Sequence, residues 1–228
     1  MRLVNTEMNI EIDMDNSPIL LVIECEERFA QMVQMLIDQV DKREGDFVLS
    51  ENNKLLAMDK YCDIIMNPFS LDINDKKIQT KLYAKISGAA EVYFEEKERI
   101  HSEIVRLLDD VVDGLPLDNI TYNLELDWNT ILKMYSVKIG TEYTSITEKL
   151  VDYIKTCALL CETKVLILVN AKSYLNKSDL LNIYEMASYF HVHIMLVEAV
   201  AEHFLPEELV YILDKDDCFI STGNTIYT

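Results

Sequence analysis

The chain has 228 residues, half of them hydrophobic, and a formal net charge of −19 at pH 7. This length allows one large core or two modest ones, and no apolar stretch approaches the roughly 20 residues of a membrane span. We expect a cytoplasmic protein that repels nucleic acid over most of its surface. The five cysteines form no CxxC pair, and their odd number argues against a disulfide framework.

The first 70 residues are predicted to mix strands with one helix. Continuous β-branched and leucine runs are typical of buried parallel strands, and period-2 patterns around polar turns indicate hairpins. The elements predicted here are a hairpin through Leu3, Ile10 and Ile12, a strand over 19–23, a helix over 28–40, a hairpin over 47–57 and a strand over 61–66.

The middle of the chain is predicted to be helical. Apolar residues keep a spacing of three to four from Ile78 to Val111, which indicates a helical rod of roughly 50 Å. Gly88 marks a candidate bend, and Gly114 ends the pattern. Two shorter helices follow, one capped by Asp127 and one by Ser145.

After residue 163 the strand-to-helix pattern returns. The predicted elements are strands over 165–169, 192–197 and 209–213 and a helix over 178–189. The sequence therefore predicts an α/β fold. A globular head with a mostly parallel sheet, resembling a degenerate P-loop fold, is formed by residues 1–70 and 163–228. An α-helical leg over residues 71–162 interrupts it.

The two strand-to-helix junctions lack the glycines that a phosphate loop needs. The first carries Glu24, Glu26 and Glu27, which are either magnesium ligands or, more simply, a solvated cluster at a helix start. The second carries Lys172 and Ser173 without a nucleophile elbow around them. We therefore expect no nucleotide binding and no catalysis.

Two pairs of residues have spacings that suit metal binding. His191 and His193 lie two apart on a predicted strand, so they are either zinc ligands or structural histidines. Cys157 and Cys161 lie one helical turn apart on an apolar stripe. That position favours buried thiols over metal or redox chemistry.

The acidic segment 118–127 is a candidate calcium site. Alternation places Asn123, Glu125 and Asp127 on one side, and all three offer the hard oxygen ligands that Ca²⁺ prefers. The alternative is an ordinary polar loop in which Asp127 caps the next helix.

A basic stripe occupies the start of the long helical region. It consists of Lys76, Lys77, Lys81 and Lys85. The stripe either faces DNA or is a solvated helix face. Since no groove-reading motif or aromatic interleaving accompanies it, any DNA binding should be independent of sequence.

Several segments along nearly the whole chain have a familiar order. They are Ile19–Glu24 with Phe29–Gln31 and Val33, Leu71–Asn74, Thr130–Leu132, Val137–Ile139, Leu168–Asn170, Ser173–Leu175, Leu180–Leu181, Tyr184–Glu185 and Val210–Asp214. In this order they resemble the CRISPR-associated adaptation protein of type II-A systems, the Csn-two family.

The resemblance implies a head that has lost its nucleotide site, a helical leg and a ring of four subunits held with Ca²⁺. It implies a central hole for double-stranded DNA ends and a non-catalytic role in spacer acquisition beside the integrase and the effector nuclease of the same system. Lys54 falls on a basic turn of the family. The family's acidic segment aligns with residues 123–127. Glu125 and Asp127 keep the family's carboxylates, whereas Asn123 and Leu126 stand at two other positions that are acidic in the family.

We therefore expect a homotetrameric ring that binds DNA ends without sequence preference. Lysines lining the hole and carboxylates on the outside would reconcile DNA binding with the acidic net charge. The alternative is a degenerate NTPase-like module that recruits proteins of the adaptation complex and does not itself bind DNA. The two hypotheses differ in duplex binding, and an active nucleotide-dependent enzyme would differ from both in nucleotide affinity.

Overall fold

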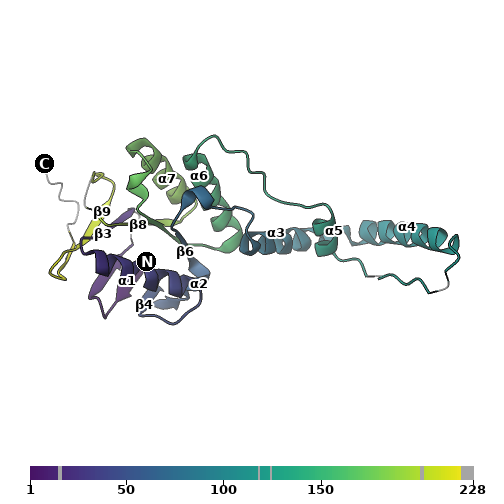
Figure 1. Ribbon diagram of the computed structural model, residues 1–228, viewed down its shortest axis with the longest axis horizontal. Helices are drawn as coiled ribbons and strands as arrows, with labels where there is room; N and C mark the ends of the chain where they lie inside the picture. Colours follow the sequence, from purple (N-terminus) through teal and green to yellow (C-terminus); the bar gives the residue numbers. More distant parts are fainter. Residues whose placement is uncertain (15–16, 118, 124, 201–202, 222–228) are drawn as a thin grey trace. The chain divides into compact units, whose positions relative to one another are not determined.

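The computed structural model describes residues 1–14, 17–117, 119–123, 125–200 and 203–221. The chain forms two compact units (Figure 1). Unit 1 consists of Met1–Ile73 and Thr141–Thr228, and unit 2 of Asn74–Gly140. Unit 1 combines sheets with helices, so the predicted α/β class is confirmed.

A six-stranded sheet in the order β10-β9-β3-β8-β7-β6 forms the centre of unit 1. Its strands are β3 (Ile19–Ile23), β6 (Cys62–Ile65), β7 (Val165–Val169), β8 (His193–Glu198), β9 (Leu209–Leu213) and β10 (Phe219–Ser221). The first five are parallel to one another, and β10 pairs antiparallel with β9. Every residue of β3 and β7 is buried, which explains why these strands read as continuous apolar runs.

A second, antiparallel sheet of four strands in the order β2-β1-β4-β5 is built from two hairpins. Its strands are β1 (Arg2–Asn5), β2 (Ile10–Asp13), β4 (Phe47–Glu51) and β5 (Lys54–Leu56). Both hairpins were predicted from the sequence, and both are confirmed. One face of this sheet, through Leu3, Ile12 and Leu49, shares a single core with α1 (Glu26–Val40) and one face of the larger sheet.

The other face of the six-stranded sheet is covered by α6 (Ile146–Thr156) and α7 (Lys177–Tyr189), which pack against each other (Figure 1). The remaining helical segments of unit 1 are α2 (Met58–Tyr61), η1 (Pro68–Ser70), the π-helical turn η3 (Cys157–Cys161) and η4 (Ala171–Ser173). Residues 141–162 thus belong to unit 1, whereas the sequence assigned them to the leg. Their apolar stripe, including Leu150 and Ile154, is buried within this unit.

Unit 2 is helical. Its elements are α3 (Lys76–Ala89), the 3-10 segment η2 (Ala90–Tyr93), α4 (Phe94–Asp113) and α5 (Trp128–Met134). The rod predicted from the sequence is therefore two helices joined by a 3-10 segment that begins two residues after Gly88. The longer one, α4, is a helix of 20 residues or about 30 Å. α3 packs against α5, and the Tyr83 hydroxyl donates to the carbonyl of Leu132 (3.4 Å).

The two chain segments that enter and leave unit 2 are joined at its base. The side-chain amide of Asn74 donates to the carbonyl of Ile139 (3.0 Å) and accepts from the N–H of the same residue (2.9 Å). Among the described residues, no helix combines the length and the apolar character required to cross a bilayer.

Candidate nucleic-acid interface and calcium segment

The α3 lysines lie on an exposed helix face. The helix begins after Asp75, whose carboxylate accepts a hydrogen bond from the N–H of Ile78 (2.7 Å). Lys77, Lys81 and Lys85 recur every fourth residue, so they share one face, and Lys76 precedes them at the helix start. All four are exposed, whereas Ile78 on another face is buried.

The charge of this face is unusual for the chain. α3 contains four lysines and no acidic residue, although the whole chain has 40 acidic and 21 basic residues. Within the described ranges, no carboxylate lies at ion-pair distance from Lys76, Lys77 or Lys81. Like charges four residues apart on a helix repel each other, so the face favours a bound polyanion.

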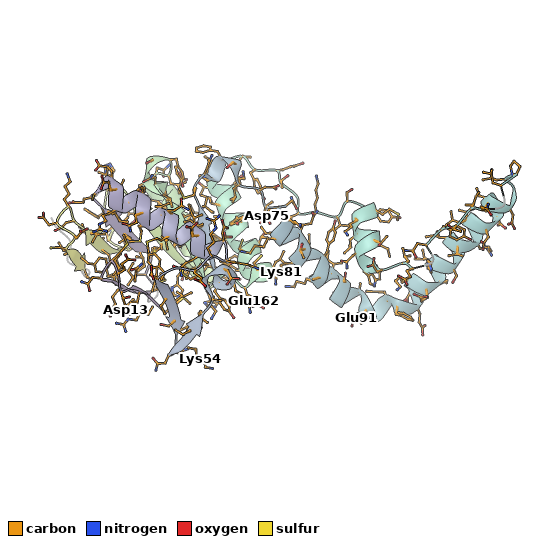
Figure 2. All side chains as sticks on the ribbon, turned by 60° about the horizontal axis from the view of Figure 1, so that its bottom comes forward. Asp13, Lys54, Asp75, Lys81, Glu91 and Glu162 are labelled. Atoms are coloured by element: carbon orange, nitrogen blue, oxygen red, sulfur yellow. The ribbon has the colours of Figure 1, made fainter. Side chains whose placement is uncertain are left out.

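Lys54 lies at the tip of the β4–β5 hairpin (Figure 2). The two-residue turn before it has positive φ at Asn52 (50°) and Asn53 (61°), as a type I′ turn requires. The residue paired with Lys54 is Glu51, whose carboxylate accepts a hydrogen bond from Lys164. That hydrogen bond also lowers the pKa of Glu51. Glu51 is thus engaged elsewhere, and the Lys54 side chain is exposed.

The five candidate lysines are therefore distributed over both units. The structure brings Lys76, Lys77, Lys81 and Lys85 together on one helix of unit 2, and Lys54 belongs to unit 1.

The three candidate calcium ligands lie just before α5. The Asn123 side-chain oxygen accepts from the N–H of Glu125 (3.0 Å), and Asp127 caps α5 by accepting from the N–H of Thr130 (2.6 Å). The hydrogen bond with Thr130 lowers the pKa of Asp127. Asp118 and Leu124 of the same acidic segment lie outside the described residues.

This donor set suits calcium in kind but not in number. Asn123, Glu125 and Asp127 are exposed and offer hard oxygens, and each amide or carboxylate keeps lone pairs beyond its local hydrogen bond. Calcium takes six to eight oxygen ligands, so three side chains supply only part of a coordination shell. Backbone carbonyls, water or another chain would have to complete it.

The junction after β7, where a phosphate loop would lie, contains an internal carboxylate. Glu198, the last residue of β8, is 5% exposed and accepts a hydrogen bond from the N–H of Lys172 (2.9 Å). Burial raises the pKa of Glu198, against the effect of the backbone N–H groups of Lys172 and Ala171. The backbone donors that could approach an anion are thus directed at the protein's own carboxylate.

A buried polar network continues from this junction. The Lys172 ammonium donates to Glu208 (2.8 Å) and to the carbonyl of His203 (2.9 Å), and the Tyr184 hydroxyl donates to the other oxygen of Glu208 (2.7 Å). Burial and the Glu208 charge raise the pKa of Tyr184. Neither Glu198 nor Glu208 was predicted from the sequence as a site residue. The available signal was an acidic residue directly beside an apolar strand.

The two histidine candidates lie in a turn and at a strand start, and the two cysteine candidates are buried in η3. His191 lies in a turn with φ of 57°, and β8 begins at His193, so the prediction that both lie on one strand is wrong. Cys157 and Cys161 are 2% and 4% exposed, which confirms the prediction of buried thiols. A hydrogen bond with Cys161 and burial raise the pKa of Cys157. In the described part of the chain, no three His, Cys, Asp or Glu side chains converge on a possible metal position.

Comparison with known proteins gives a consistent assignment. Residues 39–217 match the family model described as CRISPR-associated protein (Cas_Csn2). A CRISPR-associated protein Csn2 of Enterococcus faecalis is 20% identical over 201 residues, which cover 86% of this chain and 88% of that protein.

A second relative with the same description comes from Streptococcus agalactiae. It is 26% identical over 136 residues, which cover 58% of this chain and 60% of the relative's own length.

Proposed function

The chain belongs to the Csn2 family of CRISPR-associated proteins, and we propose that it serves spacer acquisition as a non-catalytic ring that binds double-stranded DNA ends. Family membership implies a CRISPR-related role. The exposed α3 face with four lysines and no acidic residue is the observation that carries the DNA contact. We place the protein in the cytoplasm, beside the integrase and the effector nuclease of the same system.

The lysine face of α3 is suited to contact the phosphate backbone of DNA. Lysine ammonium groups are compact charges that neutralise phosphates without reading bases, so binding is independent of sequence. A chain of net charge −19 repels DNA over most of its surface, which favours contact only where lysines are concentrated. In a tetramer each lysine is present four times, and the four faces together give a strongly basic surface.

The apolar face of α4 supports assembly with other chains. No residue of α4 is buried in the described structure. Ile100, Ile104, Leu107 and Val111 are 41–63% exposed and are spaced by four, three and four residues, as in a coiled-coil seam. Such a seam is stabilised when another apolar surface covers it. We propose that unit 2 is a leg insertion whose α4 packs in the tetramer.

Unit 1 is then the head, with a degenerate nucleotide-binding fold. Two observations support this proposal: the β7 junction follows a parallel strand, the position at which such folds bind phosphates, and the Lys172 N–H there donates to the internal carboxylate of Glu198. This arrangement supports a head that binds neither ATP nor GTP. In calcium, Asn123, Glu125 and Asp127 would contribute part of an ion site. When bound, the ion would add positive charge to this acidic segment and connect the ligand side chains with one another.

The lysine face can be tested by removing three charges from α3. The variant K77A/K81A/K85A should weaken binding of a linear duplex about equally for different sequences. It should also flatten the dependence of log affinity on log salt by about one unit for each phosphate that the protein no longer neutralises. The control K42A/K155A/K215A removes the same charge from exposed positions of unit 1. If both variants lose affinity equally, the effect is one of net charge, and the α3 contact is wrong.

A further inference from the structure

Two pockets lie on the side of unit 1 that carries α6 and α7. The first, of about 520 Å³, is lined by residues before and at the start of α6 together with η1. The second, of about 670 Å³, is lined by the segment from η4 to the first turn of α7 and by residues 203–205. Neither pocket contains the junction carboxylate Glu198 or a candidate lysine of α3.

One aromatic pair forms the boundary between the pockets. Phe69 lines the first and Tyr174 lines the second, and their rings meet edge to face with centroids 5.9 Å apart. The Lys149 ammonium donates to the carbonyl of Phe69 (3.3 Å), which holds η1 against α6. The two pockets and this ridge are called the aromatic groove below.

The groove is apolar in its floor and aromatic at its rim. Leu175, Leu180 and Leu205 are buried beneath the second pocket. Phe69 is 64% exposed, and Phe204 at the second pocket is 47% exposed. Exposed aromatic rings beside apolar hollows are typical of protein-binding surfaces, where such rings supply most of the binding energy.

The charge of the groove differs from that of the whole chain. Its ionised side chains are one carboxylate, Asp72, and three lysines. Lys172 is paired with Glu208, but no carboxylate of the described residues lies at ion-pair distance from Lys149 or Lys177. Although the chain has a net charge of −19, the excess of lysines on this surface would attract an acidic partner.

We propose that the aromatic groove docks a short acidic segment of a partner protein, which places one apolar side chain in each pocket. The two anchors lie on opposite sides of the Phe69–Tyr174 ridge, because each ring lines a different pocket. Two hollows with buried leucine and isoleucine floors accommodate side chains, whereas stacked bases use flat aromatic faces. The inference goes beyond DNA binding and involves a different surface.

A random peptide library displayed on phage, panned against the full chain in calcium, tests this proposal. Enriched peptides should contain two apolar residues, separated by at least one other residue, and acidic residues around them. For a synthetic copy of an enriched peptide, Phe69→Ala should lower affinity about tenfold or more. Tyr189→Ala is the matched control, because Tyr189 is an exposed ring in an edge-to-face pair with Phe190, outside both pockets. It should leave affinity unchanged.

Two further variants test whether the groove lysines attract the acidic peptide. K149E and K177E should each weaken binding of the selected peptide. K155E, which changes an exposed lysine elsewhere on α6, should not. Failure to enrich any peptide, or equal loss in F69A and Y189A, would overturn the proposal. Weaker binding of a polythymidine oligonucleotide by F69A, with peptide binding intact, would assign the groove to single-stranded nucleic acid instead. Duplex binding by F69A should be unchanged, which separates this test from that of the α3 lysines.

Discussion

The Glu198 carboxylate occupies the backbone donors at the end of β7 and is itself removed from solvent. Two physical effects oppose each other there. Burial disfavours the charged form, and the N–H groups of Lys172 and Ala171 favour it, with burial the larger effect on the pKa. An external anion at this junction would have to compete with Glu198 for the N–H of Lys172.

This balance makes a pH-dependent contribution to stability. Because the pKa of Glu198 is raised above the value of 4.5 for a free side chain, the folded state binds the proton more tightly than the unfolded chain. The favourable contribution of Glu198 to the free energy of unfolding is complete below pH 4.5 and is lost as the pH rises through the pKa of the folded state. In E198Q the amide oxygen still accepts from Lys172, but this titration is absent. Urea unfolding should show that the original chain loses stability relative to E198Q as the pH rises from 4.5. A difference that grows in favour of the original chain would contradict this reasoning.

Asp127 combines two possible roles that substitutions can separate. Asparagine caps helices as well as aspartate does, so D127N should keep α5 intact while removing a carboxylate from the calcium segment. D127A should lose both. We expect D127N to weaken calcium binding by about tenfold or more, with unchanged helix content by circular dichroism. Calorimetric titration with calcium measures the first quantity. Equal calcium affinity in D127N and the original chain would mean that Asp127 caps α5 and does not bind calcium.

Among the helices, α4 buries none of its residues in the described structure, although the Tyr122 hydroxyl donates to its Asp109. If the seam through Ile104 and Leu107 packs in an assembly, a charge placed there must be desolvated and will prevent association. Leu107→Glu should convert the assembly, expected at four times the 26.4 kDa chain mass, to smaller species in light scattering. Ser102→Glu adds the same charge on another face of α4 and should leave the mass unchanged. A stable monomer of the original chain in calcium would contradict the assembly.

The elements that the sequence predicted well are those whose pattern is local. The strands 19–23 and 165–169 are buried on both faces, and the α5 cap at Asp127 depends on residues three positions away. The location of α6 was predicted wrongly, because an apolar stripe shows that a face is buried but not which element covers it. Glu198 was missed because its partner, the backbone of Lys172, is 26 residues away.

Across the whole molecule, two surfaces differ in charge from the rest of the chain. The four lysines of α3 form a basic face on a chain of net charge −19, and the aromatic groove is a second surface on which lysines outnumber carboxylates. The first is suited to phosphates and the second to a protein segment. Losses of function at the two surfaces should therefore be separable in vitro.

The central claim is that a closed ring holds duplex DNA and can load only from an end. The most direct test is a mobility-shift comparison of one plasmid before and after linearisation, in calcium and at low salt. The account predicts a shift for the linear form and none for the covalently closed circle. Equal binding to both forms would contradict threading, and binding to neither would favour a protein-interaction module that does not contact DNA.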